Sequence, residues 1–285
     1  MARNDLPAAA DKAEEVHRCI APLVHPRVRE VYCDETLCVL DKPAGVLSHP
    51  NPPARQAANA LLRCQYDFEA EAFRTAGRED GTTQGQPKSL FLVHRLDQDT
   101  SGLILCAFDE AAASALKQAL AHRQVHKQYL ALVLGIPRAD QGVWRDCLQK
   151  RSRRGRAEVA VVKGRPNAVT RFRRLKVYEA AGAALLELSP ETGRTHQLRV
   201  QAAARGLPIA GDDRYGDFAA NRRAAELLGL RRMFLHAQGL ELRHPSSGEM
   251  VRFTAELDAP LAECLAKAGR LHKALRVGPA GKRRP

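Results

Sequence analysis

The sequence lacks the short glycine-rich motifs with which many enzymes hold phosphates and nucleotide cofactors. It contains no GxxxxGK[ST] motif and no GxGxxG motif after an expected strand, and these are the motifs that bind nucleoside triphosphates and dinucleotides. It also has no GxSxG motif, which argues against an α/β hydrolase. We therefore expect no nucleotide cofactor.

Disulfide, metal and membrane signatures are missing as well. The seven cysteines form no CxxC motif, and no apolar run approaches the roughly 18 residues that a membrane-spanning helix needs. The first residues lack the apolar core of a signal peptide. His122 and His126 have a spacing that metal ligands can use, but no third ligand is evident, so they are interpreted as basic residues near a helix end. We expect a cytoplasmic protein with no bound metal and no membrane partner.

Acidic residues are in short supply relative to basic ones. The chain has 45 Lys and Arg against 32 Asp and Glu, a net charge of +13, and a pI near 9.8. Basic runs recur at 150–156, 171–176 and 269–285. Such runs are often only solvated surface, but together they could follow a phosphate backbone. The charge therefore favours a nucleic acid as the partner.

Short apolar runs separated by turn residues predict more strands than helices. Strands are expected at 30–33, 37–41, 102–108, 126–137, 168–180, 183–190 and within 232–257, and helices at 54–68, 110–124 after an Asp109 cap, 192–206 and 259–269. This order predicts an α+β fold with a mixed, mostly antiparallel central sheet flanked by helices. We expect a poorly ordered lead-in at 1–27, one domain at 28–270 with an exposed insertion at about 71–89, and a basic tail at 271–285.

A polar segment, HRLDQDTSG at 94–102, interrupts two apolar runs. In an extended conformation, the side chains of Arg95, Asp97 and Asp99 point to one side, whereas Leu96 points into the core. A turn capped by Asp99 or Thr100 is the structural alternative. The residues alone leave both interpretations open.

A second segment, TGRTHQLRVQAAARG at 192–206, has the pattern of a helix ended by a glycine. On a helix, Arg194, Leu198, Gln201 and Arg205 form one stripe. Arg194 would lie at the helix start, where a facing carboxylate would be held ionised by charge pairing. The alternative is a surface helix capped by Thr192.

Six motifs in order carry a family resemblance. LDKPAGVLSHP, VHRLDQDTSGLIL, VHKQYLALV, SPETGRTHQLRVQ, GDDRYG and FLHAQGLEL together resemble the RluA-type pseudouridine synthases, from about residue 30 to residue 257. The resemblance implies the pseudouridine synthase catalytic fold with a central RNA-binding cleft. It also implies isomerisation of specific uridines in structured RNA to pseudouridine by a base-flipping reaction that uses no cofactor or metal.

The resemblance implies a role for each matching residue. Asp97 matches the catalytic aspartate, Arg194 the arginine that pairs with it, and Tyr129 the tyrosine that lies against the target base. Among residues expected to bind substrate, Leu198 matches the apolar position that packs on the base, and Arg95 the residue that fills the space left by the flipped nucleotide. His94, Thr195 and His196 lie in the same motifs and complete the expected substrate-binding set.

The substrate and two other functions stay open at the level of sequence. Many relatives carry a small RNA-binding domain, and only about 30 residues precede the first expected strand here, so target choice is expected to rest on the catalytic domain of a monomer. Ribosomal RNA and transfer RNA are both possible substrates. A non-catalytic RNA-binding or assembly factor is the main alternative. A carbohydrate glycosidase is disfavoured by the positive charge and by only five Tyr and one Trp for stacking on sugars.

Overall fold

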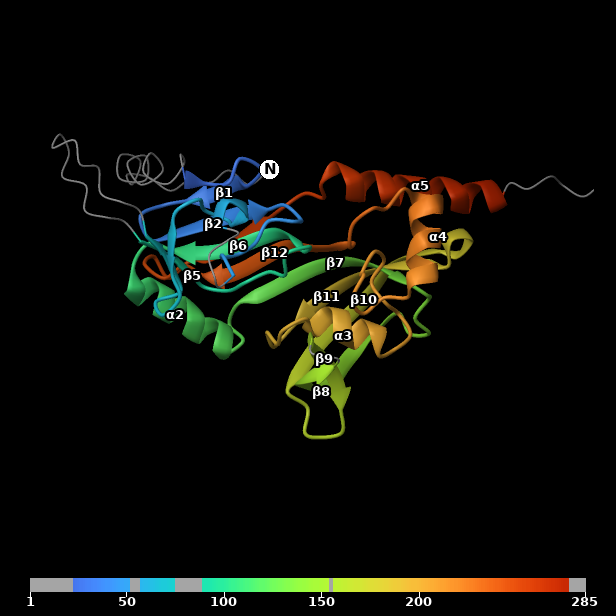
Figure 1. The fold of residues 1–285 in the computed structure, drawn as a ribbon, viewed down its shortest axis with the longest axis horizontal. Helices are drawn as coiled ribbons and strands as arrows, with labels where there is room; N and C mark the ends of the chain where they lie inside the picture. Colours follow the sequence, from blue (N-terminus) through green and yellow to red (C-terminus); the bar gives the residue numbers. More distant parts are fainter. Residues whose placement is uncertain (1–22, 52–56, 75–88, 154–155, 277–285) are drawn as a thin grey trace, which may run out of the picture. The chain divides into compact units, whose positions relative to one another are not determined.

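The structure, a computed structural model, describes residues 23–51, 57–74, 89–153 and 156–276 (Figure 1). The chain forms two compact units. The first unit comprises residues up to Val125 together with Gly239–Ala255, and the second comprises His126–Gln238 together with the residues from Glu256 onward. One strand, β12 (Leu235–Arg243), contributes its first residues to the second unit and its last residues to the first.

The first unit is built on antiparallel strand pairs. Besides the end of β12, its strands are β1 (Arg29–Cys33), β2 (Leu37–Lys42), β3 (Gln65–Asp67), β4 (Ala72–Arg74), β5 (Ser89–Leu92), β6 (Ser101–Ala107) and β13 (Met250–Thr254). Strand β6 is central, because it pairs with both β2 and β5 and neighbours β12. All residues of β2 and β6 are buried, which fits the apolar runs 37–40 and 103–107 that make up most of them.

Helix α2 (Glu110–Ala121) covers one face of these strands (Figure 1). Its N-cap is Asp109, whose side chain accepts a hydrogen bond from the Ala112 amide at 2.7 Å. Ala112, Ala113 and Leu116 pack into a core that includes Leu103 and Leu105 of β6. This packing fixes β6, and with it the loop that precedes β6.

The second unit contains a sheet of longer strands. Next to the start of β12, the order is β7 (His126–Leu134), β11 (Ala183–Pro190), β10 (Ala168–Tyr178), β8 (Gln141–Arg153) and β9 (Arg156–Val162). The pairs from β7 to β9 are all antiparallel. Strands β8 and β9 form a hairpin that carries part of the basic run at 150–156.

Three α-helices are described in the second unit: α3 (Gln197–Ala203), α4 (Phe218–Leu228) and α5 (Ala259–Arg276). Helices α4 and α5 contact each other, and Leu228 and Leu261 share a core with Leu132 and Leu185 of the sheet. Helix α3 instead contacts β8 and β9, where Val200 packs against buried apolar side chains of that hairpin (Figure 1). The α+β class and the predominance of antiparallel pairing are thus confirmed.

Several predicted elements differ in the structure. The helix expected at 54–68 is wrong where the structure describes it, since 57–59 is a single 3-10 turn and 65–67 is strand β3. The apolar spacing that suggested a helix instead buries Leu61 and Leu62 beside short strands. Residues 71–74 of the expected insertion belong largely to β4, with Ala72 and Phe73 buried, and Ser89 begins β5. The rest of that insertion lies outside the described residues.

The C-terminal half also contains differences. Helix α5 continues to Arg276, past the expected start of a tail at 271, and α4 was not predicted. The expected lead-in at 1–27 lies mostly outside the described residues. Where the structure describes the chain, no helix is both long and apolar enough to cross a membrane.

Candidate active site

Asp97 lies in a short loop of the first unit, between β5 and β6. The loop closes as a turn in which the Asp97 carbonyl accepts a hydrogen bond from the Thr100 amide at 3.1 Å. Leu96 is buried beside it, whereas Asp97 is half-buried and Asp99 is exposed. Of the two interpretations that the sequence left open, the structure shows a turn, with Leu96 buried beside it. Together the turn and Leu96 hold the Asp97 backbone at the edge of a buried strand.

A second loop, residues 43–48 after β2, holds the Asp97 loop in place. The Ser48 hydroxyl donates to the Leu96 carbonyl at 2.8 Å and accepts from the Leu96 amide at 3.0 Å. The Gly45 amide donates to the Gln98 carbonyl at 2.9 Å, and Gly45 has a φ of +84°. A side chain at this φ would be strained, so glycine suits this close approach of two loops.

Lys42 connects the same two loops from below the surface. Its side chain is fully buried, and its ammonium donates to the carbonyls of Pro43, Val46 and Gln98 at 3.1, 2.7 and 3.0 Å. An ammonium has three N–H donors, and burial of this charge requires that they be satisfied. Lys42 therefore joins the 43–48 loop to the backbone of Gln98, the residue that follows Asp97.

Two other residues of the HRLD motif contact the protein in different ways. His94 is half-buried, and its Nε2 accepts a hydrogen bond from the Leu105 amide at 3.2 Å. Arg95 is exposed, and its Nη1 lies 3.0 Å from Nε2 of His49. The ring of His94 thus fixes the loop to β6, whereas the guanidinium of Arg95 extends along the surface.

In the second unit, Arg194 lies in a turn that precedes helix α3. The N-cap of α3 is His196, so the helix predicted from 192 begins later, and Arg194 and Arg205 lie outside it. The Gln197 side chain organises the turn, because its Oε1 accepts from the Arg194 amide at 3.0 Å and from the Thr192 hydroxyl at 2.7 Å. Arg194 itself is exposed, and its Nε donates to the Asn167 carbonyl at 3.1 Å.

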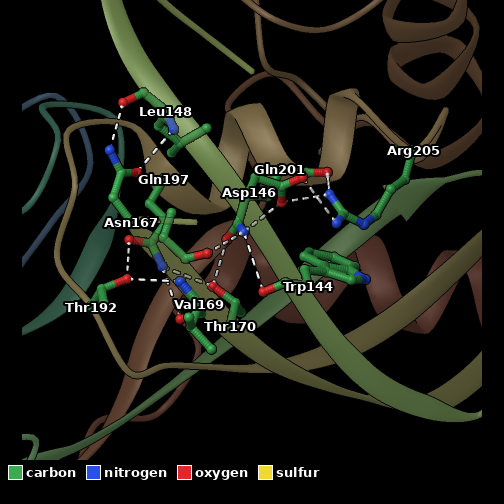
Figure 2. A network of polar contacts seen from close by, with 11 residues as sticks. Trp144, Asp146, Leu148, Asn167, Val169, Thr170, Thr192, Gln197, Gln201 and Arg205 are labelled. Carbon is green, nitrogen blue, oxygen red and sulfur yellow. Dashed lines mark hydrogen bonds and ion pairs between the residues drawn. The ribbon is translucent and has the colours of Figure 1, made fainter. Parts of the chain in front are cut away.

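Buried polar groups anchor α3 to β8 and β10 (Figure 2). The Gln197 amide donates to the Val169 carbonyl and to the Thr170 hydroxyl, and Thr170 donates to Gln201 at 2.6 Å. Gln201 in turn donates to Asp146, which also pairs with Arg205. Helix α3 is therefore not the exposed, Thr192-capped surface helix that was the alternative, since six of its seven residues are buried.

A buried ion pair links the GRTHQLR motif to the GDDRYG motif. Arg199 binds Asp212 through two hydrogen bonds of 2.8 Å, and both residues are at most 5% exposed. Burial alone would raise the pKa of Asp212, but the Arg199 guanidinium and the amides of Tyr215 and Arg214 outweigh it, so the pKa lies below its ordinary value. His196, half-buried and left-handed at φ +53°, has its Nδ1 2.7 Å from the Tyr215 hydroxyl.

The remaining candidate residues of the second unit lie on β7 and α3. Tyr129 and Leu198 are both buried, and Thr195 is exposed. Lys127, two residues before Tyr129 and therefore on the same side of the strand, approaches Gly193 next to Arg194. Burial lowers the pKa of Lys127 below its ordinary value.

Comparison with known proteins agrees with this set of motifs. Residues 36–204 match the family described as RNA pseudouridylate synthase. The chain belongs to this family. Ribosomal large subunit pseudouridine synthase C of Escherichia coli K12 is 36% identical over 245 residues, which cover 83% of this chain and 69% of that protein. Ribosomal large subunit pseudouridine synthase D of Xanthomonas campestris is 39% identical over 239 residues, which cover 81% of this chain and 66% of that protein.

Solved structures of pseudouridylate synthases share the fold. Human RNA pseudouridylate synthase domain containing 4 is matched over 90% of this chain and 97% of its own, with a TM-score of 0.62 and 24% identity. Human RNA pseudouridylate synthase domain containing 1 gives a TM-score of 0.59 and 25% identity over the same shares. The predicted catalytic fold and the predicted enzyme class, an isomerase that converts uridine in RNA to pseudouridine, are therefore confirmed.

The predicted site residues of this pseudouridine synthase divide between the two units. His94, Arg95 and Asp97 belong to the first, and Tyr129, Arg194, Thr195, His196 and Leu198 belong to the second. Sequence reasoning missed the residues that hold these groups, above all Lys42 and Gln197. Both lie inside motifs that carried the resemblance, LDKPAG and GRTHQLR, and that was the available signal.

We expect Lys42→Met to loosen the Asp97 loop. The change keeps most of the side-chain volume but leaves three buried carbonyls without their donor, so the free energy of unfolding should fall by about 2–3 kcal/mol. The kcat for pseudouridine formation should fall more than the apparent affinity for RNA, because Lys42 holds the loop that carries Asp97 and, being fully buried, does not itself face the RNA. Urea denaturation and steady-state kinetics measure the two effects.

Lys117→Met is the matched control for this change. Lys117 forms a partly exposed ion pair with Glu71 at 2.8 Å in the same unit. Its loss should cost less than about 1 kcal/mol and leave kcat unaffected. Equal effects of the two substitutions would contradict a special role for Lys42.

Proposed function

We propose that this synthase isomerises specific uridines of large-subunit ribosomal RNA, acting as a cytoplasmic monomer without a cofactor. The observation that carries this proposal is the identity of 36–39%, over more than four fifths of the chain, to two enzymes named for the ribosomal large subunit. The net charge of +13 is consistent with a large polyanionic substrate.

In the proposed reaction, the carboxylate of Asp97 acts at the target nucleoside. The bond between N1 of uracil and C1′ of ribose breaks, the base turns, and C5 bonds to C1′. The C5 hydrogen leaves as a proton and N1 takes up a proton, so the product is an isomer of uridine. Cleavage of a glycosidic bond requires a carboxylate close to the anomeric carbon, as nucleophile or as base. Asp97 is proposed for this role because it is the acid of the HRLD motif and lies in the loop held by Lys42 and Ser48.

Arg194 is proposed as the cation that keeps Asp97 ionised when a flipped nucleotide excludes water from the site. A guanidinium offsets the desolvation of a carboxylate and can bind it through two parallel hydrogen bonds. The exposed position of the Arg194 side chain, on a turn organised by Gln197, supports this role. Rigid support of this kind is what a catalytic group needs in order to be held in a productive geometry.

The remaining residues are proposed to receive the nucleotide. Tyr129 is assigned to contact with the target base, and Leu198 to packing on it. Arg95, exposed beside the Asp97 loop, is assigned to the space that the flipped nucleotide leaves. His94, Thr195 and His196 are assigned to the border of this site. Unstacking the uridine costs a few kcal/mol, which contacts to the RNA backbone offset.

Mapping of pseudouridine at nucleotide resolution tests the proposed substrate. Ribosomal and transfer RNA are compared between the parent strain, a strain without the gene, and that strain carrying the gene on a plasmid. One or more uridines of large-subunit rRNA should lose modification in the deletion and regain it on complementation. Loss confined to transfer RNA would overturn the rRNA assignment and leave the enzyme class intact.

A further inference from the structure

An aromatic cluster lies beside the Asp97 loop in the first unit. The rings of His49 and Tyr66 are stacked, with centroids 5.1 Å apart and an angle of 12° between the planes. The ring of Phe68 meets both of them edge-on, with centroids 5.1 Å from Tyr66 and 6.2 Å from His49. Phe68 is nevertheless 46% exposed, whereas large apolar side chains in this unit are mostly buried.

The core and a well-defined turn hold this cluster in place. Tyr66 of β3 is the cross-strand partner of Phe73 of β4, and the centroids of their rings are 4.9 Å apart. Phe73 is fully buried. The Asp67 carboxylate accepts hydrogen bonds from the amides of Glu69 and Ala70, which fixes the turn that carries Phe68. Phe68 is thus held at the surface by an ordered turn.

The cluster is joined to the Asp97 loop by two direct contacts. Arg95 Nη1 approaches His49 Nε2 at 3.0 Å, and Ser48, the residue before His49, binds Leu96 through its hydroxyl. His49 Nδ1 lies 2.8 Å from the Pro50 carbonyl, so a neutral ring that donates from Nδ1 and accepts at Nε2 satisfies both contacts. The cluster and the loop therefore form one continuous surface feature.

The charges around the cluster suit a polyanion. Arg95 is exposed, and two of the carboxylates near the rings have cationic partners: Glu71 pairs with Lys117 at 2.8 Å, and Asp67 pairs with Arg74 at 3.0 Å. A third carboxylate, that of Glu69, is exposed next to Phe68. Exposed aromatic rings beside a guanidinium are the groups on which proteins stack unpaired RNA bases. A merely structural cluster has no need to expose a phenylalanine next to a cation.

We infer that Phe68, with His49 and Tyr66, forms a stacking ledge for an unpaired RNA base next to the uridine that is isomerised. This inference rests on the proposed function, because it presumes that Asp97 acts on that uridine. When the uridine leaves its stack, its neighbour loses a stacking partner, and the ledge replaces that partner. The ledge therefore contributes to binding of the opened RNA rather than to the chemical step.

The test uses the full-length enzyme and a large-subunit rRNA fragment that contains the mapped uridine. In Phe68→Ala, the KM for this fragment and the dissociation constant should rise about tenfold, since stacking of one base on an aromatic ring has this order of effect. The change in kcat should be much smaller than the change in KM. Phe68→Trp should restore binding, because it keeps an aromatic face.

Fluorescence of 2-aminopurine reports the stacking directly. Two RNAs are compared, with 2-aminopurine on the 5′ side or on the 3′ side of the target uridine. Binding of the wild-type enzyme should reduce the fluorescence of one of the two, and binding of Phe68→Ala should not. Phe218→Ala is the matched control, because Phe218 is 85% exposed on α4 and is not among the residues assigned to the site or to the ledge. It should leave the KM and the quenching at their wild-type values.

Two results overturn the ledge. One is a KM and quenching in Phe68→Ala within about twofold of wild type, and the other is a loss of kcat with an unchanged KM, which indicates structural support of the loop. Both are distinguishable from failure of the proposed function, in which the wild-type enzyme itself forms no pseudouridine in the rRNA fragment.

Discussion

Asp97→Asn is expected to reduce pseudouridine formation at least about a thousandfold while RNA binding stays within about twofold of wild type. The substitution is nearly isosteric, so the turn closed by the Asp97 carbonyl and the Thr100 amide is retained. What is lost is the carboxylate that is proposed to act as nucleophile or general base on the target nucleoside. Loss of such a group typically costs two to four orders of magnitude or more in rate.

Tritium release from RNA labelled at C5 of uridine measures this effect, because the C5 proton leaves when the new carbon–carbon bond forms. A gel-shift titration with the same RNA measures binding, and thermal unfolding verifies that the variant is folded. These three readouts separate loss of chemistry from loss of substrate and from loss of structure.

Asp99→Asn is the matched control for this experiment. Asp99 lies two residues further along the same turn and is exposed, and it is assigned no catalytic role. The change removes the same charge from the same loop, so a purely electrostatic effect on RNA binding would be similar in both variants. Retained turnover in Asp97→Asn, or equal losses in the two variants, would contradict the proposed mechanism.

The strands could be predicted because their sequences satisfy local rules. Strands β2 and β6 each contain a run of four or five apolar residues, 37–40 and 103–107, and β7, β10 and β11 are bounded by turn residues, so each was located within a few residues. Strands β3 and β4 were missed because each has three residues, too few for any periodicity to be visible. Their partners come from other parts of the chain, which a local pattern does not reveal.

The helices show where tertiary contacts override a local pattern. The segment 192–196 has helix-compatible spacing, but the Gln197 side chain captures the Arg194 amide and holds a turn there. Helix α4 was missed although both of its caps are in the sequence: Asp217 accepts from the Ala220 amide, and Gly229 ends the helix with φ +70°. Here the signal was present and was not used.

For the site, the sequence identified the groups proposed to touch RNA but not those that position them. Asp97, Tyr129 and Arg194 were found because they match motif positions with known chemistry. Lys42 and Gln197 act mainly through backbone carbonyls and amides, and no pattern of side-chain types specifies which backbone groups a long side chain will reach. The pairing of Asp97 with Arg194 remains a prediction.

The buried pair of Arg199 and Asp212 leads to the largest expected effect on stability. Arg199→Met should lower the free energy of unfolding by about 3–5 kcal/mol, because it leaves the Asp212 carboxylate buried without its cation. Asp212 would retain only its hydrogen bonds from the Arg214 and Tyr215 amides, at 2.9 and 3.0 Å. Urea denaturation at neutral pH measures the loss.

Solvent exposure determines how much an ion pair contributes to the free energy of unfolding, and a control variant tests this. Arg222→Met removes an exposed pair with Glu226 on α4 and should cost less than about 0.5 kcal/mol. The double variant Arg199→Met with Asp212→Asn should recover part of the stability, because no charge stays buried and the amide oxygen still accepts from the Arg214 and Tyr215 amides. A cost below about 1 kcal/mol for Arg199→Met would show that the pair is solvated in solution.

The dependence of stability on pH provides a second test of the pair of Arg199 and Asp212. The pKa of Asp212 is lowered in the folded protein, so the unfolded chain takes up a proton here at a higher pH than the folded chain does. The stabilisation is therefore fully present above the unfolded value of about 3.9 and is lost as the pH falls through the folded pKa. In Arg199→Met the cation is absent at every pH, so the difference in stability from wild type should shrink as acid protonates Asp212. A difference that stays constant down to acid pH would mean that Arg199 stabilises the fold by packing and not through this carboxylate.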